Sequence, residues 1–564
     1  MRIKHFFGLA VIAAMTASCS SNNELVNGGN GSGKVENGTA YASFKINLPT
    51  TTGGTRADDP TPGTPSFDHG TAAEYEVKNG TILIFDATTD KFVTSADLGT
   101  MNPWTDVKAD GVTTAAIATV KLSGVWVTGN YNALVLLNNN TTDNATKKVT
   151  LPTTADTYAN WSKDVLKANA TNYVSTDGIF MANAPMYSAT SEPTTLVKIK
   201  NVCASPEEAQ AKAATVVYVE RGLAKVTMQN FADDGYDIAD GTYKGGNVKI
   251  NNWQLDVTNM STFPVHQTGT LKDSWAEIWN TPRFYDQTST AFKRVYWGVD
   301  PNYNNSDYQT LANCKTAFNM ITKDKVVGEA GNAHPQYCLE NTFDLNNMKQ
   351  GQTTRVVFKA VFTPNGFTVP KTFYKIGNNT DIWKEADLET QIHTVAVTAM
   401  GITDAAEQAK YVVKLDATDN NISGKAGQHL VKKCNITYTG EAASSLVTDD
   451  IVDKINDKLG LSAETGISTY LNGEAYYIAR IKHFNELTHW TPGTGYGTDN
   501  AAYLGRYGVL RNNWYELSVN KVSGLGYPDV PEVKPTVPDD ENDQYINVSV
   551  KILDWAKRSQ SVDL

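Results

Sequence analysis

The chain has 564 residues, 41% of them hydrophobic, which is enough for two or three domains that each bury a core. It carries 49 Lys and Arg against 60 Asp and Glu, a net charge of −11. This acidic balance argues against nucleic acid as a partner, because nucleic-acid binding needs clustered positive charge.

The N-terminal segment has the pattern of a bacterial lipoprotein signal. Arg2 and Lys4 precede an apolar run over residues 6–15, and small residues lead to Cys19. The run is too short to cross a bilayer, which takes about 20 residues. We predict a signal peptide at residues 1–18 and lipid attachment at Cys19, which would anchor the precursor in the outer membrane. The alternative is an ordinary signal peptide followed by an incidental cysteine.

A half-buried strand is predicted at residues 40–48. Its sequence, AYASFKINL, alternates strictly and places Phe44, Ile46 and Leu48 on the apolar face. The tract TTGGTRADDPTPGTP follows almost at once, and its Thr, Gly and Pro content predicts a flexible linker. This tract holds Arg56, the first arginine after the signal segment.

The body of the chain reads mostly as β structure. Six runs of β-branched and alternating apolar residues are bounded by turn residues, and they lie at residues 81–85, 131–137, 215–219, 355–362, 476–481 and 514–519. This pattern predicts β-sandwich domains, which we place at residues 57–230 and 231–526.

Two helices are predicted within this β-rich body. Ser205 followed by proline and then by Glu208 forms a capping-box pattern at a helix start. Residues 449–459 place three aliphatic side chains on one stripe and end at Gly460.

Motifs for catalysis, cofactors and metals are absent from the sequence. There is no HExxH, Walker loop, G-x-S-x-G or Rossmann glycine pattern, so we expect no enzyme, cofactor or metal site. The 26 Tyr and 11 Trp allow either sugar-stacking platforms or aromatic cores. Four widely spaced cysteines follow Cys19, and they allow either free thiols or one or two disulfides.

A second alternating strand is predicted at the C-terminal end. Ile546, Val548, Val550 and Ile552 share one face. The proline-rich residues 527–543 before it predict an extended spacer that could reach about 50 Å. This is further than a strand must travel to pair within its own domain, so the strand could act outside it.

The sequence here resembles a known family. RYGVLRNNWYELSVNKVSGLGYP at residues 506–528, the spacer, the terminal strand, Trp555 and the ending VDL resemble the structural subunit of the Bacteroidales minor fimbrium, a type V pilus fimbrillin. VYVERGLAKV at 217–226, FMANAP at 180–185 and YCLENTF at 337–343 are similar to further family positions.

The resemblance implies a mainly β fold of two transthyretin-like Greek-key sandwiches with a few short helices and an exchangeable C-terminal strand. It implies a lipidated propeptide at residues 19–56, with lipid on Cys19 and a cut between Arg56 and Ala57 by an arginine-specific protease. The cut would release the strand at residues 40–48. A strand from residues 527–564 of another subunit would then fill the groove.

The function implied is that of a cell-surface fimbrial subunit that supports adhesion. Its expected partners are other copies of itself, anchor and tip subunits, the processing protease and, through lipid on the precursor, the outer membrane. The alternative from the aromatic content is a glycan-binding surface lipoprotein that does not polymerise and keeps its lipidated Cys19.

Overall fold

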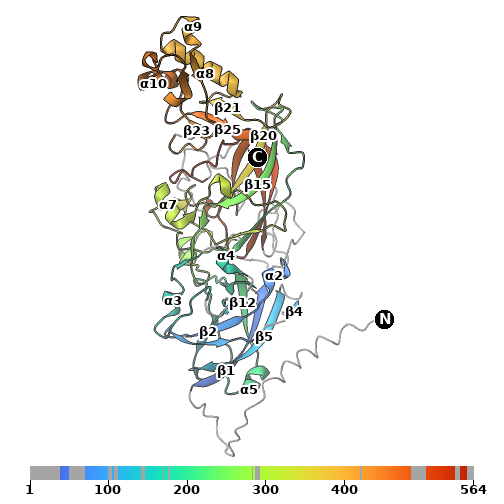
Figure 1. Cartoon of the computed structure of the whole chain (residues 1–564). Helices are drawn as coiled ribbons and strands as arrows, with labels where there is room; N and C mark the ends of the chain where they lie inside the picture. The colour runs from blue at the N-terminus through green and yellow to red at the C-terminus, as the bar shows by residue number, and fades with distance from the viewer. Residues whose placement is uncertain are drawn as a thin grey trace, which may run out of the picture.

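The computed structural model of the chain describes residues 38–49, 70–99, 105–106, 112–140, 147–168, 170–175, 178–281, 284–285, 292–419, 422–483, 503–539 and 546–554. These residues form an elongated body (Figure 1). The first strand and α5 lie at one end of this body, and α8, α9 and α10 lie at the opposite end. All six predicted runs are confirmed as strands or parts of strands.

The N-terminal part is built on one sheet of nine strands. In order across the sheet they are β3 (Phe92–Asp97), β2 (Gly80–Asp86), β6 (Tyr131–Leu137), β10 (Met181–Asn183), β12 (Thr215–Arg221), β1 (Thr39–Pro49), β5 (Val112–Ser123) and β4 (Thr105–Asp106), with β11 (Val197–Lys198) paired to β6. Alternate residues of β1, β2, β6 and β12 enclose a common apolar core. β12 pairs with β1 through residues 215–218 and with β10 through residues 219–221, so this one strand joins the β1, β5 and β4 group to the β3, β2, β6 and β10 group.

The C-terminal part is a sandwich of two four-stranded sheets. One contains β19 (Gln336–Cys338), β13 (Ala224–Met228), β27 (Asn513–Val522) and β28 (Ile546–Asp554); the other contains β14 (Tyr236–Asp237), β15 (Asn247–Asp256), β20 (Arg355–Thr363) and β26 (Glu474–Arg480). Both sheets contribute to one core. The chain passes from the first part to this sandwich between β12 and β13, ahead of the boundary expected at residue 230.

A head with its own core completes the far end of the body (Figure 1). It contains β21 (Phe373–Ile376), α8 (Glu385–Ala399), α9 (Ala405–Gln408), β22 (Tyr411–Val413), β23 (Gln428–His429), β24 (Ile436–Tyr438), α10 (Asp449–Lys458) and β25 (Ile467–Tyr470). The prediction at residues 449–459 is confirmed by α10, which Thr448 caps and which Gly460 follows with a φ of 69°.

The remaining elements are short. They are α2 (Ala72–Tyr75), α3 (Tyr158–Trp161), β7 (Leu166–Lys167), α4 (Ala170–Tyr173), β8 (Val174–Ser175), β9 (Gly178–Ile179), α5 (Pro206–Ala211), β16 (Thr258–Asn259), β17 (Ser261–Thr262), α6 (Leu271–Ser274), α7 (Leu311–Ala317) and β18 (Phe318–Asn319). The predicted cap of α5 is confirmed, because the Ser205 side chain accepts a hydrogen bond from the amide of Glu208.

The four cysteines after Cys19 are free thiols; three are buried and Cys434 is exposed. Within the described ranges, no helix is both long and apolar enough to cross a membrane. No group of three or more His, Cys, Asp or Glu residues among the described residues has the arrangement of a metal site.

Candidate strand-exchange site

The first strand, β1, lies in the interior of the N-terminal sheet. It pairs antiparallel with β5 from Thr39 to Pro49 and parallel with β12 from Phe44 to Asn47. Its backbone is therefore bonded on both sides, unlike that of an edge strand. Removing β1 would break the sheet between β5 and β12 and leave two unpaired strand edges.

One face of β1 is part of the core, as the alternation predicted. Phe44 and Ile46 are fully buried, and Leu48 is 3% exposed. These side chains share a core with residues of β2, β6 and β12. Each buried side chain of this size contributes roughly 1.5–3 kcal/mol to stability, so loss of β1 would leave an apolar groove as well as unpaired backbone.

The other face of β1 is less open to water than a half-buried strand implies. Ser43 is 7% exposed and Asn47 is 2% exposed, and α5 packs against β1. The Ser43 Oγ bonds the carbonyl oxygen of Ala209 in α5 at 2.8 Å and lies 2.8 Å from the Oγ1 of Thr119 in β5. The buried Oδ1 of Asn47 has no hydrogen-bond partner among the described residues. At these two positions the strand is buried on both faces rather than half-buried as predicted.

A buried thiol marks the end of this site. The amide of Tyr41 donates to the carbonyl of Cys203 and the amide of Cys203 donates to the carbonyl of Tyr41, both at 2.8 Å. Cys203 is fully buried. Departure of β1 would remove both bonds and uncover this thiol.

The processing residues predicted from the sequence lie outside the described residues. This applies to Cys19, Arg56 and Ala57. The chain is described again from Gly70, just before α2. The proposed cut would therefore fall between β1 and all later described elements.

The second predicted strand is β28, whose backbone pairs antiparallel with β27 of the same chain. The register sets Val550 opposite Leu517 and Ile552 opposite Tyr515. Among the described strands, β28 pairs with β27 alone, so it is an edge strand of the C-terminal sandwich. In the single chain this strand therefore pairs within its own domain, whereas we expected it to act outside that domain.

The spacer before β28 is bound to the body over residues 527–539. Val530 and Val533 are 8% and 5% exposed. The guanidinium of Arg355, paired with Asp256 at 2.8 Å, also donates to the carbonyl of Pro531 at 2.7 Å. The predicted extended spacer is instead packed against the body over these residues, because its valines find apolar partners and the Pro531 carbonyl finds a donor.

The spacer ends in a buried aspartate. Asp539 is fully buried, its amide donates to the carbonyl of Met348 at 3.1 Å, and its Oδ2 accepts from Thr353 Oγ1 at 3.0 Å. Six residues separate Asp539 from the start of β28. The seven Cα–Cα steps from Asp539 to Ile546 span at most about 25 Å, so β28 begins within that distance of this residue.

A buried charge cluster anchors the wall of the site formed by β12. Glu220 lies at the end of β12, 2.6 Å from His266 Nδ1 and 2.8 Å from Arg294 Nε. Burial alone would raise the pKa of Glu220, but Arg294 and His266 outweigh it and lower the pKa to about 2. This cluster was not predicted from the sequence. The signal was a Glu-Arg pair inside an apolar strand, which requires buried partners.

A second cluster connects α2 to the C-terminal sandwich. The Lys225 ammonium lies 2.7 Å from Glu74 and 3.6 Å from the ring centroid of Trp514, and the Tyr337 hydroxyl donates to Glu74 at 2.6 Å. Burial raises the pKa of Glu74, but Lys225 and Tyr337 outweigh it and lower the pKa overall. The first described helix after the linker is therefore fixed to the body.

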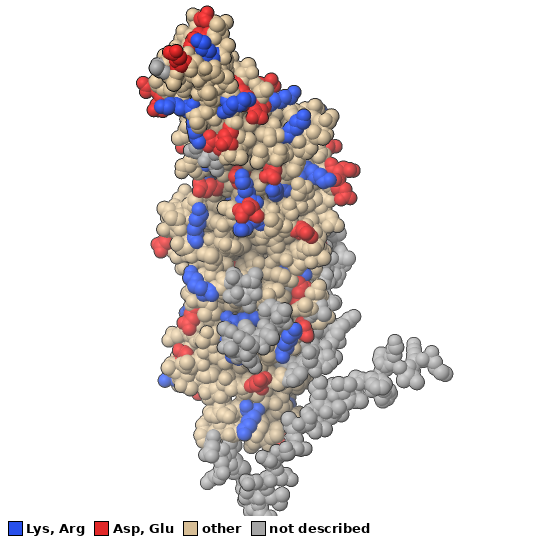
Figure 2. Space-filling model, viewed as in Figure 1, with Lys and Arg blue, Asp and Glu red and all other residues tan. Residues whose placement is uncertain are grey.

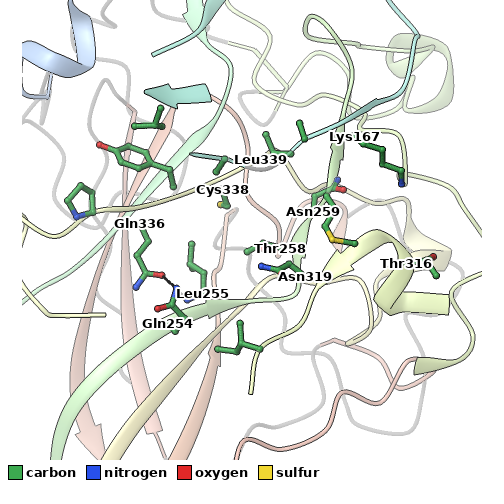
Figure 3. Close-up of a pocket in the computed structure, with 17 residues that line it drawn as sticks. Lys167, Gln254, Leu255, Thr258, Asn259, Thr316, Asn319, Gln336, Cys338 and Leu339 are labelled. Carbon is green, nitrogen blue, oxygen red and sulfur yellow. Dashed lines mark hydrogen bonds between the residues drawn. The ribbon is translucent and has the colours of Figure 1, made fainter. Parts of the chain in front are cut away.

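A pocket of about 820 Å³ lies between residues of β7 and residues of β15 and β19 (Figure 3). Its lining is mostly aliphatic and amide, and Gln254 donates to Gln336 at 2.8 Å. Burial raises the pKa of the lining thiol Cys338 to about 12, so this thiol stays protonated near neutral pH. The hydroxyl of Tyr337 is bonded to Glu74. Neither of these two side chains is therefore an activated nucleophile.

Residues 468–561 match the family described as Major fimbrial subunit protein type IV, Fimbrillin, C-terminal. This match confirms the fimbrillin resemblance in the segment that contains β27 and β28. It relates the segment to a structural subunit, in agreement with the expectation that the chain is not an enzyme. No curated protein sequence matches the chain.

Three solved structures resemble the chain at low sequence identity and low TM-score. A putative cell adhesion protein from Parabacteroides distasonis is 11% identical, with a TM-score of 0.39 over 93% of this chain and 99% of that one. One from Bacteroides eggerthii is 12% identical, with a TM-score of 0.35 over 94% and 100%. The tip fimbrial protein Mfa3 from Porphyromonas gingivalis, with a C-terminal truncation, is 10% identical, with a TM-score of 0.30 over 91% and 100%. At these values the likeness carries no argument about function.

Proposed function

We propose that the chain is a structural subunit of a cell-surface fimbrium that supports adhesion. It is exported as a lipoprotein through Cys19, cut after Arg56, and polymerised by strand exchange. The observation that carries the proposal is the position of β1: it is an interior, core-forming strand, and it precedes the linker that contains Arg56. One cut in that linker would leave β1 attached by noncovalent contacts alone.

The physical basis is the slot that β1 would leave. Two unpaired edges, β5 and β12, would face each other across an apolar groove, and an exposed strand edge is a template for an incoming strand. Slot and donor strand are different surfaces, so each subunit would bind the next head to tail. A heterologous contact that does not close on itself gives a filament.

The proposed donor is the strand that contains Ile546, Val548, Val550 and Ile552. In the single chain this strand has one backbone neighbour, whereas the slot offers two. Each added backbone hydrogen bond contributes about 0.5–1.5 kcal/mol. The second ladder therefore favours transfer of the strand from β27 to a slot in another copy.

The proposed partners are other copies of the chain, anchor and tip subunits, an arginine-specific protease and, for the precursor, the outer membrane. Nucleic acid is not among them, because the net charge of the chain is −11. On the face shown in Figure 2, Lys and Arg are interspersed with Asp and Glu. The glycan-binding alternative gains no support from the described aromatic residues. Of the tryptophans that the structure describes, Trp126 is the one that is strongly exposed, at 52%.

The test is to purify the protein from the cell surface, sequence its N-terminus and run it unheated and heated on an SDS gel. An N-terminus at Ala57 and a heat-labile ladder are the expected results. A monomer that keeps a lipidated Cys19 would contradict polymerisation and favour the surface lipoprotein alternative.

A further inference from the structure

The strand β1 and the proposed donor strand share more than an alternating pattern of apolar residues. Residues 42–47 read ASFKIN, and residues 548–553 read VSVKIL. In the same chain direction, Ser549 aligns with Ser43, Lys551 with Lys45, and Ile552 with Ile46. We propose that the donor enters in this direction and register, with Ser549 taking over the contacts of Ser43. This inference rests on the proposed function.

The apolar alternation cannot decide the register by itself. Any slip by two residues keeps Ile546, Val548, Val550 and Ile552 on the same face, because side chains repeat every second residue. A donor slipped by two residues in one direction would place Val548 at the position of Phe44, and the opposite slip would bury the Asp554 carboxylate in the core at the position of Ile46. The outer face of the strand must therefore decide between the two registers.

That outer face is enclosed at the position of Ser43. The Ser43 side chain is buried under α5, bonded to the carbonyl of Ala209 and adjacent to the Thr119 hydroxyl. A small side chain with a hydroxyl donor fits this place, and Ser549 supplies one. In the slipped register the larger Asn547 would have to fit there.

The position of Asn47 also separates the two registers. Asn47 is 2% exposed, and its buried Oδ1 lacks a partner among the described residues. The proposed register replaces this amide with Leu553 and so removes an unsatisfied buried group. The slipped register would place the Lys551 ammonium at this position, and an unpaired buried charge costs more than repacking a few methyl groups.

The proposed register also sets the end of the donor strand. It would place Asp554 at the position of Leu48, where the regular pairing of β1 with β5 ends. A carboxylate does not fit that core position, which is 3% exposed in β1. We infer that the inserted strand ends at Leu553.

The test is cysteine crosslinking in assembled polymer, in a background of Cys203→Ser and Cys434→Ser. Ser43 faces Thr119 across the ladder, and Lys45 faces Ile117. Chains that carry Ser549→Cys with Thr119→Cys, or Lys551→Cys with Ile117→Cys, should give a covalent ladder that survives boiling in SDS and disappears with reductant. Neighbouring strands bring such pairs within disulfide or short-crosslinker range.

Matched pairs distinguish the other arrangements. Crosslinking of Asn547→Cys to Thr119→Cys, with Ser549→Cys to Ile117→Cys, would establish the slipped register and overturn this inference. Crosslinking of Ser549→Cys to Thr119→Cys together with Asn547→Cys to Ile117→Cys would establish the reversed direction and overturn it as well. Filaments without any of these crosslinks would also overturn it, while leaving polymerisation intact. If chains cut after Arg56 form no filaments by electron microscopy, the proposed function fails and this inference fails with it.

Discussion

The strands β1 and β28 have the same alternating pattern but different places in the fold. β1 is bonded on both sides and contributes five residues to the N-terminal core. β28 lies at a sheet edge and is bonded to β27 alone. Sequence pattern therefore specifies that a segment forms a strand, while its neighbours decide how firmly it is held.

The difference gives the exchange a direction. Loss of β1 would open a two-sided slot, whereas departure of β28 would uncover one edge of the C-terminal sandwich. A strand that moves from the edge to the slot gains a second ladder. A covalent linker keeps β1 in the slot at high local concentration, and cutting the linker removes that advantage.

Removing β28 should have the largest effect on assembly. A chain truncated after Asp543 keeps the spacer bound through Asp539, and it should fold with a stability loss of a few kcal/mol from the β27 ladder. It should form no filament of its own. Its slot remains, so it should cap growing filaments and shorten them in proportion to the amount mixed in. Filament length by electron microscopy measures this, and normal filaments from the truncated chain would rule out C-terminal donation.

Keeping β1 in place should block assembly almost as completely. Arg56→Ala should leave a folded monomer in which β1 still fills the slot. Cys203, which is bonded to β1 through Tyr41, should stay protected from a thiol reagent in a Cys434→Ser background. In the cut chain before assembly, Cys203 should react. Arg56→Lys is the matched control: it keeps the positive charge but should also resist an arginine-specific protease and block assembly. Filaments from Arg56→Ala would show that this cut is not the trigger.

A charge on the core face of the donor should weaken assembly more than one on its outer face. Val550→Asp would bury an unpaired carboxylate in the slot at a cost of several kcal/mol. Asn547→Asp aligns with Tyr41, which is only partly buried, and should cost far less. The yield of unheated ladder on an SDS gel compares the two variants. Equal losses would mean that the inserted strand is buried on both faces along its whole length.

Much of the fold was predictable because local signals coincide with it. Strand alternation located β1, β6 and β27, and caps located α5 and α10. The 15-residue helix α8 was missed. Its N-cap is Lys384, whose side chain makes no capping hydrogen bond, and its second half is rich in Thr and Val, which are more typical of strands.

The remaining features depend on contacts between distant residues, which one sequence does not reveal. β1 meets β12 at Phe44 and Thr215, far apart in the chain. The prolines of residues 527–543 predicted an extended spacer. Val530 and Val533 instead pack against the body and fix the spacer there. The burial of Ser43 depends on α5, so alternation alone could not predict that this face is covered.

The last prediction concerns the wall of the slot once β1 has gone. β12 would then be held by β10 on one side and, at its end, by Glu220 between His266 and Arg294. Glu220→Gln removes the charge that neutralises a buried guanidinium and should cost about 3–5 kcal/mol. The loss in free energy of unfolding should be larger in the cut chain than in the precursor, where β1 also supports β12. Urea unfolding of both forms measures this, and equal losses would mean that β1 gives β12 no support.

The same variant has a distinct pH signature. The pKa of Glu220 is lowered in the fold to about 2 from a usual value of 4.5. A carboxyl group whose pKa is lowered in the fold stabilises the fold at any pH above its usual pKa. That stabilisation is lost as the pH falls to the pKa of the group in the folded state. The wild-type chain should therefore lose this contribution between about pH 4.5 and pH 2, and Glu220→Gln should not. The difference between the two in free energy of unfolding should be largest near neutral pH and should narrow in acid. A difference that stays constant with pH would mean that the carboxylate charge of Glu220 does not hold this wall.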